Sequence, residues 1–186
     1  MPFSQSREQP LARDSRDGRK KNMGAMHIAA DKKDVEMLRL LHSHQCSLEA
    51  VEKDEQTPIF YGINCGSLEV VKYLHSVGAN LEHRETQLRT PFYWAASTGE
   101  LDIMNFLIAQ GVNVNTPSSL GRSALSKACW NGRRDVVEIL LTCPNIAIDS
   151  QDNNGRTALH NAAWGSAGGR AGIKFAVNPD DSPDCA

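Results

Sequence analysis

The stretch that decides the fold is "TPIFYGINCGSLEVVKYLHSVGANLE", residues 57–82. Its Thr-Pro start suits a helix N-terminus, because threonine caps free amides and proline fits the first helical position. Gly66 breaks that helix, and apolar residues then recur three and four apart over residues 68–74, as in an amphipathic helix. Gly78 is a natural stop for the second helix. The stretch therefore predicts two short helices followed by a polar connection.

The same pattern recurs along the chain, which is the signature of a repeat architecture. It is visible at residues 24–49, 90–115 and 123–149, and it begins again as "TALHNAAWG" at 157–165. The equivalent residues His27, Phe60, Tyr93 and Ser126 are spaced by 33, and His160 follows after 34. One such unit cannot bury its apolar face alone. We therefore expect the units to stack into a helical solenoid.

The period and the motif resemble the ankyrin repeat, most closely in "GRTALHNAA" at 155–163 and in the stretches after Thr57 and Thr90. The resemblance implies an all-α ankyrin-repeat solenoid of stacked helix-turn-helix units with short β-hairpin-like connecting loops. Its units are expected near residues 19–51, 52–84, 85–117, 118–151 and 152–165, which together make a domain of residues 19–165. The first unit lacks Thr-Pro and has Lys33 for the usual glycine, as terminal repeats often differ.

The two ends of the chain depart from the repeat. Residues 1–18 are rich in Ser, Gln, Pro and Arg, which predicts a disordered tail. The Gly-rich residues 166–181 are expected to be an inserted loop, and residues 182–186 have the Ser-Pro-Asp signature of a helix start. The fifth unit would then lack nearly all of its second helix. We interpret the sequence ending at Ala186 as a fragment or a short isoform, in which the second helix of the fifth unit is cut off. A natural terminus with a frayed last unit is the alternative.

Composition limits the classes of partner. The chain is 40% hydrophobic and 23% charged, with a net charge of −2, so bulk charge does not suggest nucleic acid or an anionic membrane. No apolar run is long enough to span a bilayer. The five cysteines are odd in number and form no Cys-x-x-Cys pair, which favours reduced thiols in the cytoplasm. The basic "GRKK" at 18–21 adds the nucleus as a second compartment.

The sequence predicts no catalytic residue, no metal site and no cofactor. His42, His44 and Cys46 are of zinc-ligand types, but residues two apart do not share a helix face. The resemblance implies that His27 and His160 are structural, with hydrogen bonds within and between repeats. Carboxylates are expected on solvated helix faces, with no paired acid arrangement. We therefore do not expect an enzyme.

The resemblance implies a protein or peptide partner, because ankyrin-like folds usually bind at the hairpin tips and the exposed side of the first helices. The predicted contact residues are Gln56, Arg89, Arg122, Trp130, Asn131, Arg156 and Trp164. The three arginines share one repeat position and are expected to stack as a ladder, with the two tryptophans at another shared position. Such groups suit acidic or aromatic side chains. The alternative is that these arginines are common in ankyrin-like sequences and that Trp164 packs under the inserted loop.

The functional hypothesis is a protein–protein interaction module without catalysis. The alternative is the substrate-targeting or regulatory arm of a longer enzyme or ubiquitin-ligase adaptor, with its effector domain beyond Ala186. A nucleic-acid binder is disfavoured, because acidic residues such as Glu85 lie between the arginines. An uncapped last unit predicts some self-association. "LIAQGVNVN" at 107–115 resembles hairpins in which ankyrin asparagines are hydroxylated, which singles out Asn115; a structural role in its own turn is the alternative.

Overall fold

The computed structural model describes residues 23–167. The tail predicted at 1–18, the helix start predicted at 182–186 and most of the loop predicted at 166–181 lie outside the described residues. Within residues 23–167 the structure contains helices and no strands, which confirms the all-α prediction. The helices are α1 (Ala25–Asp31), α2 (Val35–Ser43), α3 (Pro58–Asn64), α4 (Leu68–Ser76), α5 (Pro91–Thr98), α6 (Leu101–Ala109), α7 (Ala124–Trp130), α8 (Arg134–Thr142) and α9 (Ala158–Ala167).

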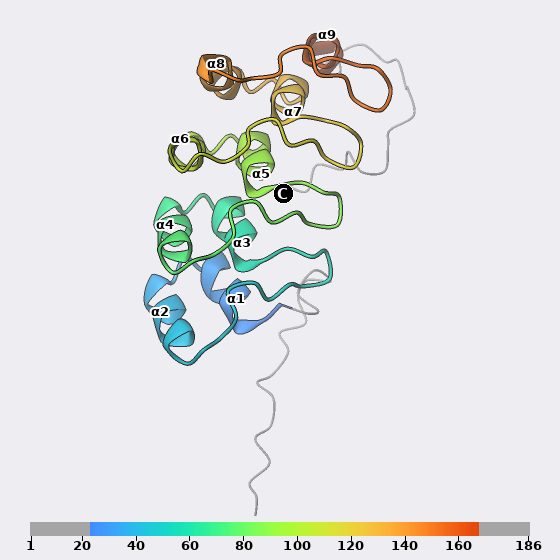
Figure 1. The fold of residues 1–186 in the computed structure, drawn as a ribbon. Coiled ribbons are helices and arrows are strands. Elements are labelled where there is room, and N and C mark those ends of the chain that lie inside the picture. Colours follow the sequence, from blue (N-terminus) through green and yellow to red (C-terminus); the bar gives the residue numbers. More distant parts are fainter. Residues whose placement is uncertain (1–22, 168–186) are drawn as a thin grey trace, which may run out of the picture.

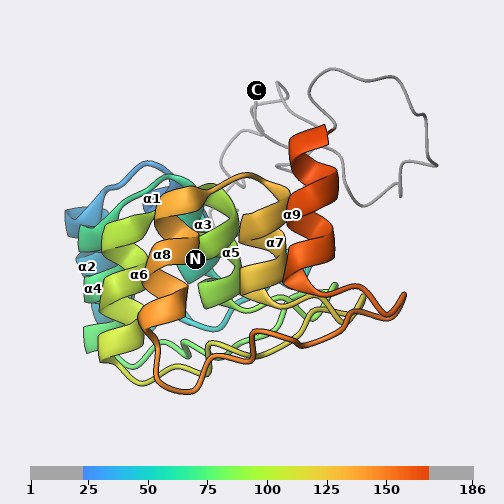
Figure 2. The same ribbon diagram turned by 90° about the horizontal axis from the view of Figure 1, so that it is seen from above.

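The helices form a stack of pairs (Figure 1). The first helices α1, α3, α5, α7 and α9 follow one another in one row, and the second helices α2, α4, α6 and α8 form a row beside them. Figure 2 looks down the stack and shows the connecting loops running out to one side beneath the helices. The molecule therefore has a face made of loops and first helices, and a different face made of second helices.

Local chemistry explains where the helices begin. Pro58 and Pro91 occupy the first turns of α3 and α5. The Thr90 hydroxyl accepts a hydrogen bond from the Tyr93 amide at 3.2 Å, and the Ser123 hydroxyl caps α7 in the same way through the Ser126 amide. These caps satisfy amides that have no partner inside the helix, so each unit starts at the same place in the repeat.

Three repeat positions have a left-handed backbone. The first contains Lys33, Gly66, Gly99 and Gly132, the second contains Gln45, Gly78 and Gly111, and the third contains Glu55, Leu88, Gly121 and Gly155. Lys33 has a φ of 58° and Leu88 has a φ of 57°, so both take a conformation that glycine adopts without a steric penalty. Lys33 therefore adopts the same backbone conformation as the equivalent glycines, despite its side chain. Leu88 holds an apolar side chain, 44% exposed, at the tip of a loop.

The core is one continuous cluster between the two rows of helices. Each unit contributes a large side chain from its first helix, such as Phe60 or Phe92, and an apolar residue from its second helix, such as Leu74 or Met104. All four are almost completely buried. The small Ala95-Ala96 pair on α5 is also fully buried, which lets neighbouring first helices approach closely.

Apolar side chains become exposed at the two ends of the stack. Leu159 on α9 is 78% exposed, whereas Leu125, its equivalent on α7, is 2% exposed. At the other end Met37 on α2 is 43% exposed, whereas Val70, its equivalent on α4, is completely buried. Helix α9 continues through Ala167, which is two residues into the range where the inserted loop is predicted.

Candidate functional site

The loops of the stack are organised around buried acids. Glu52, Glu85 and Asp152 share one repeat position and are all buried. One carboxylate oxygen of each accepts the backbone amides two and four residues later; for Glu85 the donors are Gln87 at 3.1 Å and Arg89 at 3.0 Å. The expectation that carboxylates lie only on solvated helix faces was therefore wrong. These acids are buried because the tight turn leaves amides that need an acceptor.

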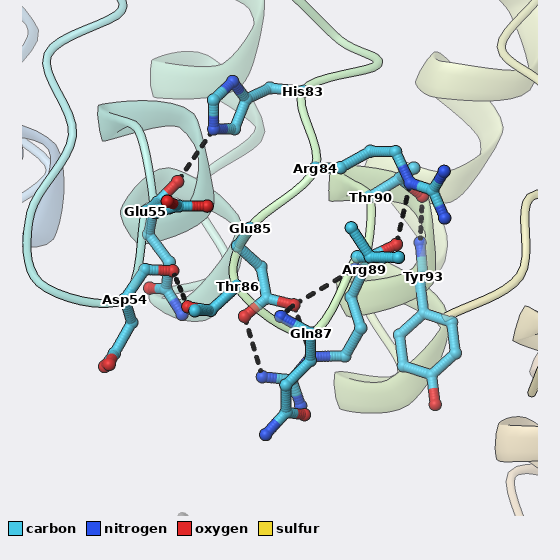
Figure 3. A network of polar contacts seen from close by, with 12 residues as sticks. Asp54, Glu55, His83, Arg84, Glu85, Thr86, Gln87, Arg89, Thr90 and Tyr93 are labelled. Atoms are coloured by element: carbon cyan, nitrogen blue, oxygen red, sulfur yellow. Dashed lines mark hydrogen bonds and ion pairs between the residues drawn. The ribbon is translucent and has the colours of Figure 1, made fainter. Parts of the chain in front are cut away.

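Arg89 is held by the acid of its own unit (Figure 3). Its Nε and Nη2 donate to the two carboxylate oxygens of Glu85 at 2.9 and 3.1 Å, which is a bidentate pair. The guanidinium also lies over the Trp94 ring, 4.8 Å from its centroid. The side chain of Arg89 is about one-fifth exposed, so it presents a fixed cationic edge beside an indole at the base of the loop.

The other two predicted arginines have different partners. Arg122 is 7% exposed, and its Nε lies 4.0 Å from Oδ2 of Asp152 in the following unit. The Arg156 guanidinium lies 4.2 Å from the centroid of the Trp164 ring. The three guanidiniums therefore differ in their partners, although they share a repeat position. The reason is that each loop offers a different acid or ring within reach.

The predicted tryptophans occupy one repeat position, at the end of α7 and within α9. Trp130 is the last residue of α7 and is partly exposed, and Trp164 on α9 is 40% exposed. Asn131 follows Trp130 and is exposed, and its side-chain amide donates to the Ser97 carbonyl of the preceding unit at 3.1 Å. Trp130 and Asn131 thus lie together at the C-terminal end of α7.

Gln56 and the motif histidines serve the packing of the stack. His27 accepts from the Gly24 amide at Nδ1, at 3.1 Å, and donates from Nε2 to the Gln56 carbonyl at 3.0 Å. His27 therefore bonds within and between units, as the resemblance implies. His160 accepts from the Thr157 amide at 3.3 Å and is exposed at the end of the stack. The side chain of Gln56 is partly exposed at the edge of its loop.

Asn115 belongs to a row of bonds between successive loops. Its Oδ1 accepts from the Ala147 amide at 2.9 Å, and its Nδ2 donates to the Asn145 carbonyl at 2.6 Å. Glu49 and Glu82 occupy the same repeat position and accept from the amide of the next loop in the same way. The Asn115 side chain therefore bonds the following loop rather than its own turn.

Two aromatic residues of this face were missed from sequence. Trp94 and Tyr61 share a repeat position on the first helices and are both partly exposed. Burial raises the pKa of Tyr61 to about 12, and the nearby carboxylates of Glu52, Asp54 and Asp31 add to the rise. Listing the residues at each repeat position would have revealed this aromatic pair.

A small cavity lies between the loop that carries Gln87 and Arg89 and the next loop, which carries Ser118 and Arg122. Its volume is about 20 Å³, and it is lined by Gln87, Arg89, Tyr93, Ser118, Ser119, Leu120, Arg122 and Lys127. The lining has three cationic side chains and no carboxylate. A volume of this size holds about one water molecule or one oxygen atom of a ligand.

Within the described residues 23–167, no group of three or more His, Cys, Asp or Glu side chains is arranged to hold a metal ion. No helix in that range is long and apolar enough to cross a membrane. Burial raises the pKa of the Cys65, Cys129 and Cys143 thiols, which disfavours the nucleophilic thiolate. The arrangement is that of a rigid surface.

Comparison with known families gives one match. The model of the family "Ankyrin repeats (3 copies)" matches residues 9–85 and 75–152, which together cover well over half of the chain. A search of curated proteins finds no match.

Proposed function

The chain belongs to the ankyrin-repeat family, and from this premise we propose that it binds one partner protein or peptide through the face made of loops and first helices. Ankyrin repeats are generally protein–protein interaction modules, so the general class follows from the family. The finer proposal is that the binding surface lies over the third, fourth and fifth units and that it performs no catalysis.

The observation that carries this proposal is the pair Trp130 and Trp164. Both are large aromatic side chains left partly exposed at equivalent repeat positions, while the core aromatics Phe60 and Phe92 are fully buried. Tryptophan and arginine are the residues most enriched among those that dominate binding energy. Covering both indoles with a partner would bury apolar area that the stack itself does not use.

The rest of the face supports the same proposal. Arg89 and Arg156 are each fixed against an indole, so little side-chain entropy is lost when a partner contacts them. Leu88 projects an apolar group from a loop tip in a conformation that costs free energy. A rigid face of this kind favours a partner that brings acidic and aromatic groups.

The experiment that tests the proposal is quantitative affinity capture from cell lysate, read by mass spectrometry. The bait is the whole chain, and the test variant is Trp130→Glu, because Trp130 does not belong to the buried core. Glu138→Lys on the exposed face of α8 is the matched control. Circular dichroism first confirms that both variants keep the wild-type helix content. Partners lost only with Trp130→Glu support the proposal, and partners retained by both variants refute it.

A protein partner is preferred to nucleic acid. Glu85 pairs with Arg89 of its own unit, and Asp152 pairs with Arg122 of the preceding unit, so the face lacks the continuous basic stripe that a phosphate backbone needs. The targeting-arm alternative requires an effector domain past Ala186, and coding sequence that continues there into such a domain would favour it. A cytoplasmic or nuclear location is proposed on the four free cysteines of the described residues, Cys46, Cys65, Cys129 and Cys143.

Two further proposals concern modification and assembly. Hydroxylation of Asn115 requires that its side chain leave the carbonyl of Asn145. A modified chain would therefore show a weaker link between the loop of Asn115 and the loop of Asn145. Self-association is proposed between the C-terminal end of one copy, at Leu159, and the N-terminal end of another, at Met37. Both side chains lie at positions that are buried in the neighbouring units, so each end resembles one half of an internal interface.

A further inference from the structure

The loop tip of the third unit carries a leucine at a position where the backbone favours glycine. Leu88 has a φ of 57°, whereas its equivalents in the fourth and fifth units are Gly121 and Gly155, each with a φ of 72°. A left-handed conformation is unfavourable for a residue that has a Cβ atom. The Leu88 side chain is also 44% exposed, so its burial within this chain offsets little of that cost.

The hydrogen bonds of this loop hold Leu88 in the strained conformation. The Leu88 amide donates to the Glu85 carbonyl at 2.6 Å, and Nε of Arg84 donates to the Leu88 carbonyl at 3.1 Å. The Glu85 carboxylate accepts the amides of Gln87 and Arg89, which flank Leu88 (Figure 3). The loop is therefore fixed on both sides of the leucine. Backbone strain that the surrounding structure holds in place is concentrated at functional sites.

The loop of the fourth unit is fixed against this one and carries a second apolar side chain. The Ser119 amide donates to the Gln87 carbonyl at 2.8 Å. Nη2 of Arg84 donates to the Pro117 carbonyl at 2.6 Å, so one guanidinium bonds both loops. Leu120, which follows Ser119, is partly exposed. The two tips therefore form one rigid projection with a leucine from each loop.

Leucine occurs at these tip positions in the third and fourth units alone. In the second and fifth units the positions equivalent to Leu120 and Leu88 hold acids, an amide and a glycine, namely Asp54, Glu55, Asn154 and Gly155. The exposed Thr86 and Ser119 beside the two leucines are polar and uncharged. The projection therefore differs from the neighbouring tips because it offers an apolar contact.

We propose that Leu88 and Leu120 enter an apolar groove on the surface of the partner protein. A side chain that projects from a loop tip is buried best by a concave surface. Burying the two leucines there would remove apolar area from water, and the loops are already fixed before the partner arrives. Neutral polar groups at the rim of the groove would match Thr86 and Ser119. The inference rests on the proposed function, because it names the chemistry of one contact on the proposed face.

The first experiment replaces Leu88 in the whole chain with a photoreactive leucine analogue, which is irradiated in cell lysate. Mass spectrometry identifies the crosslinked protein and the residues at the crosslink. We expect one protein, crosslinked at apolar residues of a surface groove. The control places the analogue at Leu141 on α8, which is 50% exposed on the second-helix face, and it should not crosslink that protein. A crosslink only to a second copy of this chain, or to no protein, would overturn the inference.

The second experiment measures by calorimetry how that protein, once purified, binds variants of the whole chain. Leu88→Asn removes the apolar side chain, and asparagine tolerates the left-handed backbone. We expect it to weaken binding by about tenfold or more without lowering the midpoint of urea unfolding. Leu88→Met keeps an apolar side chain and should bind within about threefold of the wild type. Glu55→Asn makes the matched change at the equivalent tip, which has a φ of 60°, and should leave binding unchanged.

The outcomes separate this inference from the proposed function. If Leu88→Asn binds as tightly as the wild type, or if Glu55→Asn weakens binding equally, the leucine contact is wrong. A lower urea midpoint for Leu88→Asn also overturns it, because the side chain would then serve the fold. Trp130→Glu tests the proposed face without altering either loop tip. Loss of binding in Trp130→Glu but not in Leu88→Asn therefore refutes the leucine contact alone, and the reverse result refutes the tryptophan contact alone.

Discussion

The Nε atom of Arg122 lies 4.0 Å from Oδ2 of Asp152, a carboxylate that belongs to the following unit. Arg89, at the same repeat position as Arg122, instead donates two hydrogen bonds to Glu85 of its own unit. The difference arises because Ser118 replaces the acid in the fourth loop. The arginine of this repeat position is thus paired within its own unit in one case and with the next unit in the other.

Removing the charge of Glu85 should destabilise the stack. Glu85→Gln leaves the Arg89 guanidinium partly buried without its counter-charge and weakens the acceptor of two backbone amides. We expect a loss of about 2 kcal/mol in the free energy of unfolding, measured by urea denaturation. Glu69→Gln, on the exposed surface of α4, should change it by less than about 0.5 kcal/mol. Equal losses in the two variants would contradict the role given to Glu85.

The left-handed backbone at Leu88 should be a source of strain. Leu88→Gly relieves a φ of 57° and is expected to raise the free energy of unfolding by about 1 kcal/mol. Gly155 lies at the same repeat position with a φ of 72°, so Gly155→Ala should lower it by about the same amount. Urea denaturation of both variants checks the pair. If Leu88→Gly lowers stability, the side chain contributes more to packing than its exposure indicates.

Tyr61 should give the fold a distinct response to alkaline pH. Burial and nearby carboxylates raise its pKa from 10.0 to about 12, so the folded state holds the phenol proton more tightly than the unfolded state does. The resulting stabilisation is complete below pH 10 and is lost as pH rises toward 12. Urea denaturation across this pH range should show that the free energy of unfolding declines as pH rises, and that it declines less in Tyr61→Phe. The difference in absorbance at the tyrosinate band between the wild type and Tyr61→Phe should show Tyr61 ionising near pH 12, and ionisation near pH 10 would contradict the described environment.

The stack ends should control self-association. Leu159→Glu places a charge at an exposed apolar position of α9, at the C-terminal end of the stack. Any dimer or longer assembly through that end should therefore dissociate. Light scattering coupled to size-exclusion chromatography measures the mass of the wild type and the variant across protein concentrations. Asn105→Glu, an exposed position in the middle of the stack, is the control. A wild-type chain that is monomeric at every concentration would refute the proposed association.

The sequence predicted the helices well because their signals are local. Pro58, Pro91 and the glycines near helix ends act through their own backbone geometry, so a single unit shows them. The site was predicted less well because it depends on neighbours in other units. Arg89 and Arg122 share a repeat position, yet their partners differ, and the fourth residue before them is glutamate in one case and serine in the other. A buried acid also cannot be told from a solvated one until the turn around it is known.

The central claim is that a partner lies on the face made of loops and first helices. The most direct measurement is site-specific photo-crosslinking in lysate, with a photoreactive amino acid placed at Ser119 on that face or at Glu138 on the second-helix face. Mass spectrometry then identifies what is crosslinked at each position. The account predicts that the same protein crosslinks from Ser119 and not from Glu138. A partner that crosslinks from Glu138 and not from Ser119 would contradict it.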